Sequence, residues 1–417
     1  MAIPAKTYST DWSYFLLNMS VFLSLPLVIL LFIPYYRQKK LNTPYEYLEI
    51  RFSSIIRLLG SCCFILYQIG RIGVILFLPS IALNLVTGVD IFLCIALMGG
   101  VSLIYTLMGG IEAVIWTDVV QVFVLMGGVS LSLILIIIDT ENGFSGIIEQ
   151  AKIYGKFNAF DLTLSLKEPT VWVMLFGGFF INLTTYGTDH TMVQRYLVTP
   201  TQKEAQKSLW IGALLTIPAT FIFFFMGTAL FVFYQVNPSA LNNDFINNDA
   251  IFPWYIVSQL PTGVSGILIA AIFAAAMSSL SSSMNSGAAS FSADVYDRYG
   301  FVWNKDPLKM ARWTTLCIGM MGILFALFMA TADIKSLWDQ FNKILGLIFG
   351  SLGGVFMLGL LTKKANTKGV LIGIVVSFTI QLIISFQQSV HLLMYAATGM
   401  ISCFISGYFG SLLFKSK

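Results

Sequence analysis

The 417-residue sequence is short of charged residues, histidine and cysteine. Charged residues make up 11% of the chain and hydrophobic residues 57%, whereas soluble globular proteins carry about 25% charged residues. The mean hydropathy of +0.81 points the same way, so the composition excludes a soluble globular protein. With only His190 and His391, a haem or a histidine-ligated metal centre has almost no available ligands.

Cysteine and catalytic motifs are equally scarce. The five cysteines lie in apolar segments without the spacing of a metal site, so we expect free packing side chains. A membrane-embedded enzyme is disfavoured because the chain has no HExxH or GxSxG motif, and we expect no catalytic residues and no cofactor. The net charge of +4 reflects the connecting segments and indicates no nucleic-acid partner.

Long apolar runs are what the chain has in abundance. A run needs about 20 residues to cross the ~30 Å hydrocarbon core of a bilayer. We count eleven such runs, which leaves little for a soluble domain and predicts a polytopic membrane protein in contact with lipid. The runs are roughly 13–35, 59–84, 91–109, 113–138, 170–192, 208–234, 262–290, 312–331, 341–361, 368–387 and 390–414.

Lysine and arginine are unevenly divided between the connections. Cytoplasmic connections of membrane proteins carry the excess of positive charge. Here 17 of the 24 Lys and Arg residues lie in 36–58, 193–207, 291–312, 362–368 and the tail FKSK. We therefore expect the amino terminus outside and the carboxyl terminus inside, which agrees with an odd number of crossings.

Ionisable residues inside the apolar runs are candidates for function. Such residues are expensive in a membrane and usually face a partner or a water-filled cavity. Arg71, in YQIGRIGVILFLP, lies too deep to reach the interface easily, although bracing a helix contact is the alternative. Asp118, in AVIWTDVVQ, could also serve as a helix cap. Asp189 and His190 form a third candidate, close to the cytoplasmic end of their span.

The stretch AAIFAAAMSSLSSSMNS (270–286) places six serines in an apolar span. Hydroxyl and carbonyl oxygens suit a hard cation such as sodium, and Asp118 would supply one negative charge. The alternative is that serines bond to the carbonyl four residues earlier and let helices pack, which needs fewer of them. Helical spacing gives one polar stripe with Ser281 and Asn285 at its edge: Ala275, Ser278, Ser279, Ser282 and Ser286.

A buried arginine on one helix and a sodium site on another suggest an anionic solute that moves with sodium. The planar fork of arginine binds a carboxylate through two parallel hydrogen bonds. The residues alone predict a carboxylate-bearing small molecule and leave its identity open.

Several segments resemble the sodium/solute symporter family. They are TPYEYLEIRF, YTLMGGIEAVIWTDVVQ, TMVQRYL and GILIAAIFAAAMSSLSSSMNSGAASFSADVY, and YQIGRIGVILFLP resembles the bacterial sialic acid (N-acetylneuraminate) branch. The similarity extends essentially from end to end. It implies a transporter of the bacterial plasma (inner) membrane, not an enzyme, with sodium as the coupling ion.

The resemblance also implies an architecture, the leucine-transporter-type five-plus-five inverted-repeat fold. In this all-α fold, residues 1–417 form one transporter domain. Residues 1–138 are the remainder of the first repeat, 170–361 are the second repeat, and 362–417 hold two additional helices.

Site residues follow from the same resemblance. The principal sodium site matches the backbone carbonyl of Ala275 with Ser278 and Ser279. A second sodium site matches Asp118, Ser281 and Ser282, with Ser278 between the two. Arg71 matches the arginine that holds the sialic acid carboxylate, and Asn182 and, more weakly, Asn18 lie where polar substrate contacts occur.

The amino end departs from the family pattern. MAIPAKTYSTDW resembles the family just after the middle of its first core helix, so the resemblance implies that the first core helix is largely missing and the chain is truncated. We expect sodium-coupled symport of sialic acid by alternating access. The alternatives are a symporter for proline or another small organic solute, and a truncated remnant that does not transport.

Overall fold

The computed structural model describes residues 1–39, 41–108, 111–241, 248–299, 307–332 and 336–414, without the side chains of 111–119 and 307. Over these residues the secondary structure is entirely helical. The helices are α1 (Ala2–Ser9), α2 (Phe15–Met19), α3 (Val21–Leu27), α4 (Ile33–Lys39), α5 (Pro44–Arg51), α6 (Ser54–Thr87), α7 (Ile91–Met108), α8 (Ile111–Asp139), α9 (Gly143–Ile153), α10 (Gly178–Thr188), α11 (His190–Leu197), α12 (Gln202–Val236), α13 (Ile251–Ser258), α14 (Thr262–Phe291), α15 (Asp297–Tyr299), α16 (Pro307–Ala330), α17 (Leu337–Leu361), α18 (Thr367–Gln387) and α19 (Tyr395–Leu413). Single turns join or extend them: η1 (Trp12–Tyr14), η2 (Val28–Phe32), η3 (Val173–Gly177), η4 (Pro238–Ala240), η5 (Asn248–Ala250), η6 (Ser292–Tyr296) and η7 (Leu392–Met394).

The predicted membrane spans are all helical. Within the described part of the chain, 10 helical segments are long and apolar enough to cross a membrane. The remaining predicted span, 170–192, consists of η3, α10 and the start of α11, and Asp189 interrupts it with extended backbone. The stretch INLTTYGTDH combines a glycine with several polar residues at membrane depth, a composition that fits an interrupted helix.

Helix starts near the Lys- and Arg-rich connections are closed by side chains. Thr201 and Glu204 form a reciprocal capping box at the start of α12. Asn366 accepts a hydrogen bond from the Gly369 backbone N–H at 3.0 Å at the start of α18. These contacts satisfy backbone donors that a helix start leaves unpaired, so α12 and α18 begin at defined residues.

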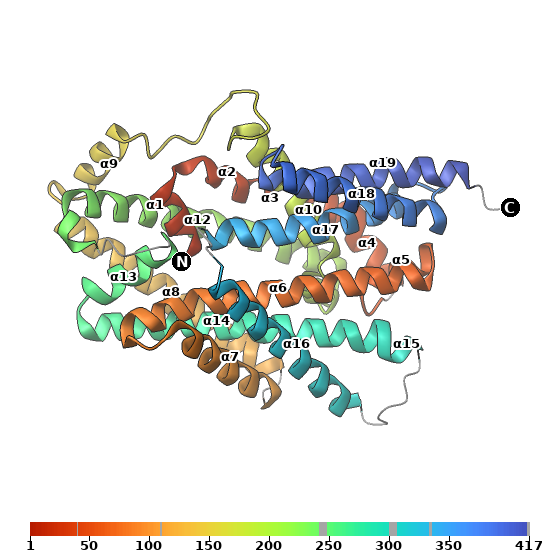
Figure 1. Cartoon of the computed structure of the whole chain (residues 1–417), viewed down its shortest axis with the longest axis horizontal. Helices are drawn as coiled ribbons and strands as arrows, with labels where there is room; N and C mark the ends of the chain where they lie inside the picture. Colours follow the sequence, from red (N-terminus) through yellow and green to blue (C-terminus); the bar gives the residue numbers. More distant parts are fainter. Residues whose placement is uncertain (40, 109–110, 242–247, 300–306, 333–335, 415–417) are drawn as a thin grey trace.

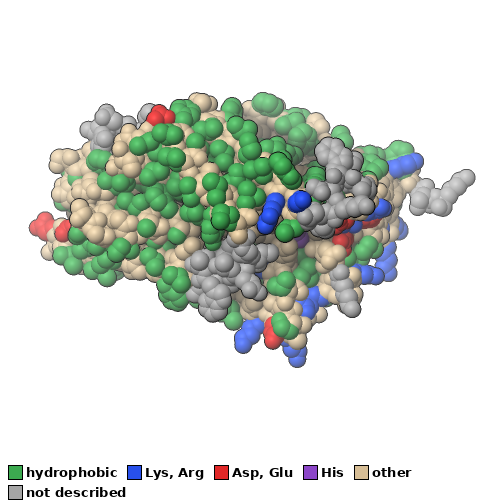
Figure 2. Space-filling model, turned by 90° about the horizontal axis from the view of Figure 1, so that it is seen from below, with side chains coloured by type: hydrophobic (Ala, Val, Ile, Leu, Met, Phe, Trp, Pro, Cys, Tyr) green, Lys and Arg blue, Asp and Glu red, His purple; other side chains and the backbone are tan. Residues whose placement is uncertain are grey.

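The long helices lie side by side along one axis (Figure 1). Helices α18 and α19 pack together on one side of the molecule, and α7 and α16 pack together on the opposite side. The surface in Figure 2 is largely hydrophobic, and Lys and Arg gather towards the end that carries the carboxyl terminus. This distribution is what a multi-pass membrane protein with a positively charged cytoplasmic end requires.

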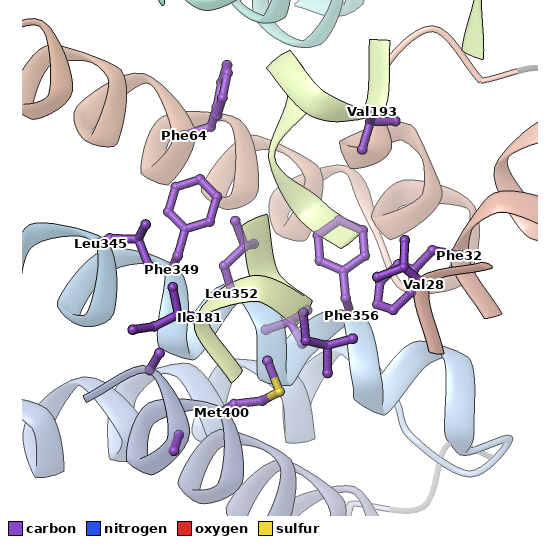
Figure 3. Packing of buried hydrophobic residues seen from close by; sticks show 14 of the residues in the cluster. Val28, Phe32, Phe64, Ile181, Val193, Leu345, Phe349, Leu352, Phe356 and Met400 are labelled. Atoms are coloured by element: carbon purple, nitrogen blue, oxygen red, sulfur yellow. The ribbon is translucent and has the colours of Figure 1, made fainter. Parts of the chain in front are cut away.

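Aromatic and aliphatic side chains pack together in the largest core cluster (Figure 3). Phe64 and Tyr67 of α6 meet Phe349 of α17, with ring centroids 6.5 Å and 4.4 Å from Phe349. Edge-to-face aromatic pairs of this kind add about 0.5–1.5 kcal/mol each beyond their buried area. The cluster fixes α6 against α17, and α6 carries Arg71 into the site described next.

Candidate functional site

A cavity of about 270 Å³ lies where α6, α8, α11 and α14 meet. Each of these helices contributes side chains from a different part of the sequence, so the cavity exists only in the folded chain. Its lining residues are Arg71, Gln121, Val122, Leu125, Thr191, Met192, Arg195, Ala275, Ser278, Ser279 and Ser282.

Arg71 is the ionisable residue that α6 presents to this cavity. Its side chain is half-buried, and no described acidic side chain lies within ion-pair distance of it. Its positive charge is close enough to interact electrostatically with the Tyr67 hydroxyl and the Asp189 carboxyl. A partly desolvated guanidinium facing a cavity favours a bidentate anionic ligand such as a carboxylate.

Four predicted sodium ligands line the same cavity. Ala275, Ser278, Ser279 and Ser282 follow the helical spacing of α14, and all four line the cavity with Arg71. Their oxygens are neutral acceptors, which can replace part of the hydration shell of a hard cation without burying excess charge. The structure therefore brings the predicted carboxylate ligand and most of the predicted sodium ligands to one place.

Ser281 and Ser286 point elsewhere. The Ser281 hydroxyl is fully buried and lies 2.9 Å from the Thr106 hydroxyl of α7. Ser286 accepts a hydrogen bond at 2.9 Å from Thr191 of α11. The Asp118 side chain lies outside the described residues, so the second sodium site stays a prediction at that position.

The break at Asp189 sets the position of α11. The Asp189 carboxylate accepts a hydrogen bond from the Thr191 backbone N–H at 2.8 Å and so caps the start of the helix. The Thr191 hydroxyl then accepts a hydrogen bond from Gln68 of α6 at 2.8 Å. This chain of contacts joins α6, α11 and α14 around one edge of the cavity.

Three polar residues of the cavity lining carry no sequence signal. Gln121 stands alone among apolar neighbours, Thr191 directly follows the polar residues Asp189 and His190, and Arg195 lies in a charged connection, so no periodic pattern singles them out. Arg195 is exposed and adds a second positive charge to the lining. Among the described lining residues there is no acidic side chain, which makes the cavity suited to an anion.

The two predicted asparagines lie away from the cavity. Asn182 donates hydrogen bonds at 3.0 Å to the Ser20 hydroxyl and to the Gly178 carbonyl, and so ties α10 to the segment between α2 and α3. Asn18 lines a separate hollow against α12. The structure does not bring these two asparagines together with Arg71. Their contact with substrate stays a prediction.

Comparison with known proteins identifies the family to which this chain is similar. The profile of the Sodium:solute symporter family matches residues 1–377. The sodium/sialic acid symporter SiaT of Proteus mirabilis is 38% identical over 99% of this chain and 84% of its own length. The sodium/sialic acid symporter NanT of Aliivibrio fischeri is 36% identical over 100% of this chain and 83% of its own length.

A solved structure shares the fold. It is described as the substrate-bound outward-open state of a Na+-coupled sialic acid symporter that reveals a novel Na+-site. The TM-score is 0.89 at 37% sequence identity, and the match covers 100% of this chain and 87% of that one. The predicted leucine-transporter-type fold is thereby confirmed, and this chain belongs to the sodium:solute symporter family.

Proposed function

We propose that this protein is a sodium-coupled symporter of sialic acid in the bacterial inner membrane. The observation that carries the proposal is the shared cavity, which is lined by Arg71 and by serines of α14. An anion and a hard cation can occupy such a cavity together, because each offsets the charge of the other in a partly desolvated space. Similarity along this chain to two sodium/sialic acid symporters supports this substrate.

Each residue in the proposal has a separate task. Arg71 binds the sialic acid carboxylate. The carbonyl of Ala275 and the hydroxyls of Ser278 and Ser279 bind the principal sodium ion. Asp118, Ser281 and Ser282 form a second sodium position, and Asn182 and Asn18 are secondary candidates for substrate contact.

Transport follows from alternating access around this cavity. In folds built from inverted repeats, substrate and ion sites lie near the bilayer midplane and interrupted helices help to form them. Helices α10 and α11 are separated by extended backbone at Asp189, and together they form an interrupted helix beside the site. The protein moves a solute and an ion and carries out no chemical conversion.

The first test is uptake of labelled sialic acid into proteoliposomes. We expect accumulation under an inward sodium gradient and none under an equal potassium gradient. The methyl ester of sialic acid, which lacks the carboxylate, should fail to compete. Absence of sodium-driven accumulation by the wild-type chain contradicts the proposed function.

The role of Arg71 is tested separately by substitution. Arg71→Ala removes two charge-assisted hydrogen bonds, each about 1.5–3 kcal/mol, so we expect sialic acid affinity to fall by roughly a hundredfold or more. Arg71→Lys keeps the charge but loses the planar fork and should restore only part of the affinity. Sodium-dependent thermal stabilisation should persist in both variants. Unchanged sialic acid affinity in Arg71→Ala would exclude this role.

A further inference from the structure

A second hollow, of about 530 Å³, lies between the end of α7 and the start of α16. It is separate from the transport cavity and shares no lining residue with it. Its lining residues are Leu107, Met108, Lys309, Arg312, Trp313 and Leu316.

The shape of the hollow follows from how the two helices pack. In the middle of the pair, an added Cβ at Gly99 would lie 2.5 Å from Cγ1 of Ile323, and one at Gly319 would lie 2.6 Å from Cδ1 of Leu103. Glycine at these positions therefore allows close contact between α7 and α16. Towards Met108 and Lys309 larger side chains occupy the interface, and the hollow opens there.

The chemistry of the hollow changes along α16. Lys309, Arg312, Trp313 and Leu316 follow i, i+3, i+4, i+7 spacing and share one face. Two exposed cations come first, then a tryptophan with 61% of its surface exposed, then an apolar side chain. This order matches the change from charged headgroup to interface to hydrocarbon in a bilayer.

The surface beyond the hollow is apolar on both helices. On α7, Val101 and Ile104 are exposed, and on α16, Met320 and Leu324 are exposed. These side chains continue the hollow into a strip of hydrocarbon-facing surface. A ligand seated at Lys309 and Arg312 would therefore extend an apolar portion between the two helices.

We propose that this hollow binds the headgroup phosphate of an anionic phospholipid of the inner leaflet, such as phosphatidylglycerol. Lys309 and Arg312 bind the phosphate, Trp313 lies at the interface, and the acyl chains follow α7 and α16. Charge complementarity supports this occupant, because two exposed cations line the hollow. Basic pockets between membrane helices on the cytoplasmic side bind anionic headgroups in the same way.

The test of the site on the unaltered protein is photo-crosslinking. The full chain is reconstituted with phosphatidylglycerol or phosphatidylcholine that carries a diazirine on the acyl chain. We expect phosphatidylglycerol to label the stretches 101–108 and 313–324 preferentially, with phosphatidylcholine labelling them no more than the rest of the membrane surface. Equal labelling by both lipids would overturn the proposal.

The basic pair is tested with Lys309→Gln/Arg312→Gln. Each cation near the surface contributes about 1 kcal/mol to binding an anionic membrane lipid, so binding of phosphatidylglycerol at this site should weaken roughly tenfold or more. Native mass spectrometry of the detergent-solubilised protein measures that change. The matched control is Lys203→Gln/Lys207→Gln, an exposed pair in the first turns of α12 with the same loss of charge, and it should leave binding at the hollow unchanged.

A phosphate site without lipid specificity is a distinct outcome. Inorganic phosphate, added as the competing probe, should not displace phosphatidylglycerol, because it offers nothing to the apolar strip. Displacement by phosphate at equal concentration overturns the lipid assignment. The proposal is independent of sialic acid transport, since both readouts measure lipid and not uptake.

Discussion

At the residue scale, the serines of α14 differ in their surroundings although they are adjacent in sequence. Ser279 lines the cavity with Arg71. Ser283 is fully buried, and its hydroxyl has no hydrogen-bond partner among the described residues. A serine-rich span therefore contains both candidate ligands and packing residues, and the two kinds should respond differently to the same substitution.

Ser279→Ala should weaken sodium binding while Ser283→Ala should not. Removing one oxygen ligand from a cation loses an interaction of about 1.5–3 kcal/mol, so the sodium concentration for half-maximal uptake should rise roughly tenfold or more. Ser283→Ala removes a buried unsatisfied hydroxyl and should keep or raise thermal stability. Sodium-dependence curves of uptake and melting curves measure the two effects. Equal sodium dependence in both variants contradicts the assignment of Ser279.

Glu49 of α5 carries a pH dependence of stability. Its partial burial tends to raise its pKa, but hydrogen bonds from Arg57 at 2.8 Å and Arg298 at 2.7 Å outweigh this and lower the pKa below 4.5. Because the folded-state pKa is the lower one, the stabilisation is complete at neutral pH. It is lost as the pH falls from about 4.5 through the folded-state value.

The measurement is the melting temperature of wild type and Glu49→Gln between neutral and acidic pH. We expect wild type to be the more stable at pH 7 and the difference to vanish in acid. Glu141→Gln, at an exposed position outside the described ion pairs, is the control and should match wild type throughout. A difference that persists unchanged into acid contradicts the ion-pair explanation.

At the element scale, one buried carboxylate joins three segments at the Lys- and Arg-rich end. Asp294, in η6 after α14, is fully buried and accepts hydrogen bonds at 2.7 Å from Arg57 of α6 and from Thr43 at the start of α5. Ser290 donates a further hydrogen bond to it at 3.0 Å. The end of the serine-rich helix is thereby attached to α5 and α6.

Asp294→Asn should destabilise the protein by roughly 3 kcal/mol, because it leaves Arg57 without its most buried partner. Glu46 and Glu49 still pair with Arg57 and limit the loss. The apparent melting temperature in detergent measures it. Asp297→Asn, three residues further on at an exposed position, should have no effect. An unchanged melting temperature for Asp294→Asn shows that the network contributes nothing to stability.

The helices themselves could be predicted from composition, because a run of about 20 apolar residues admits no other structure in a membrane. The interruption at Asp189 was also readable, since Gly187 and polar residues coincide there. That Arg71 and α14 line the same cavity could not be predicted, because residues far apart in sequence carry no local signal of contact. Only the family resemblance connected them.

Side-chain partners were the least predictable part. Asn182 fits a substrate contact by its type and depth, yet the fold brings it to Ser20. Thr191 gives no periodic signal, yet it joins Gln68 to Ser286. Whether a polar residue in an apolar span faces a ligand or a neighbouring helix depends on helix rotation, which a short apolar pattern does not fix. The division into repeats at 1–138, 170–361 and 362–417 likewise stays a prediction.

At the scale of the whole molecule, our proposal puts both ligands in one cavity, so we expect their binding to be coupled. Arg71 and the serines of α14 line the same space of about 270 Å³. We expect a bound sodium ion to add positive charge to the cavity and thereby to favour binding of a carboxylate there. Coupling between two sites in one protein is typically 1–3 kcal/mol, or about 5–150-fold in affinity.

Thermodynamic reciprocity makes this coupling testable without transport. Sodium should raise the affinity for sialic acid by some factor, and saturating sialic acid should raise the affinity for sodium by the same factor. Titration calorimetry at low and high sodium, and sodium-dependent melting with and without sialic acid, measure the two factors independently. Potassium is the matched control in both experiments. Arg71→Ala should bring both factors to one while sodium alone still stabilises the protein, because a ligand that binds only the folded state raises its stability by RT ln(1 + [L]/Kd). Sodium and sialic acid that bind without influencing each other would contradict a shared cavity.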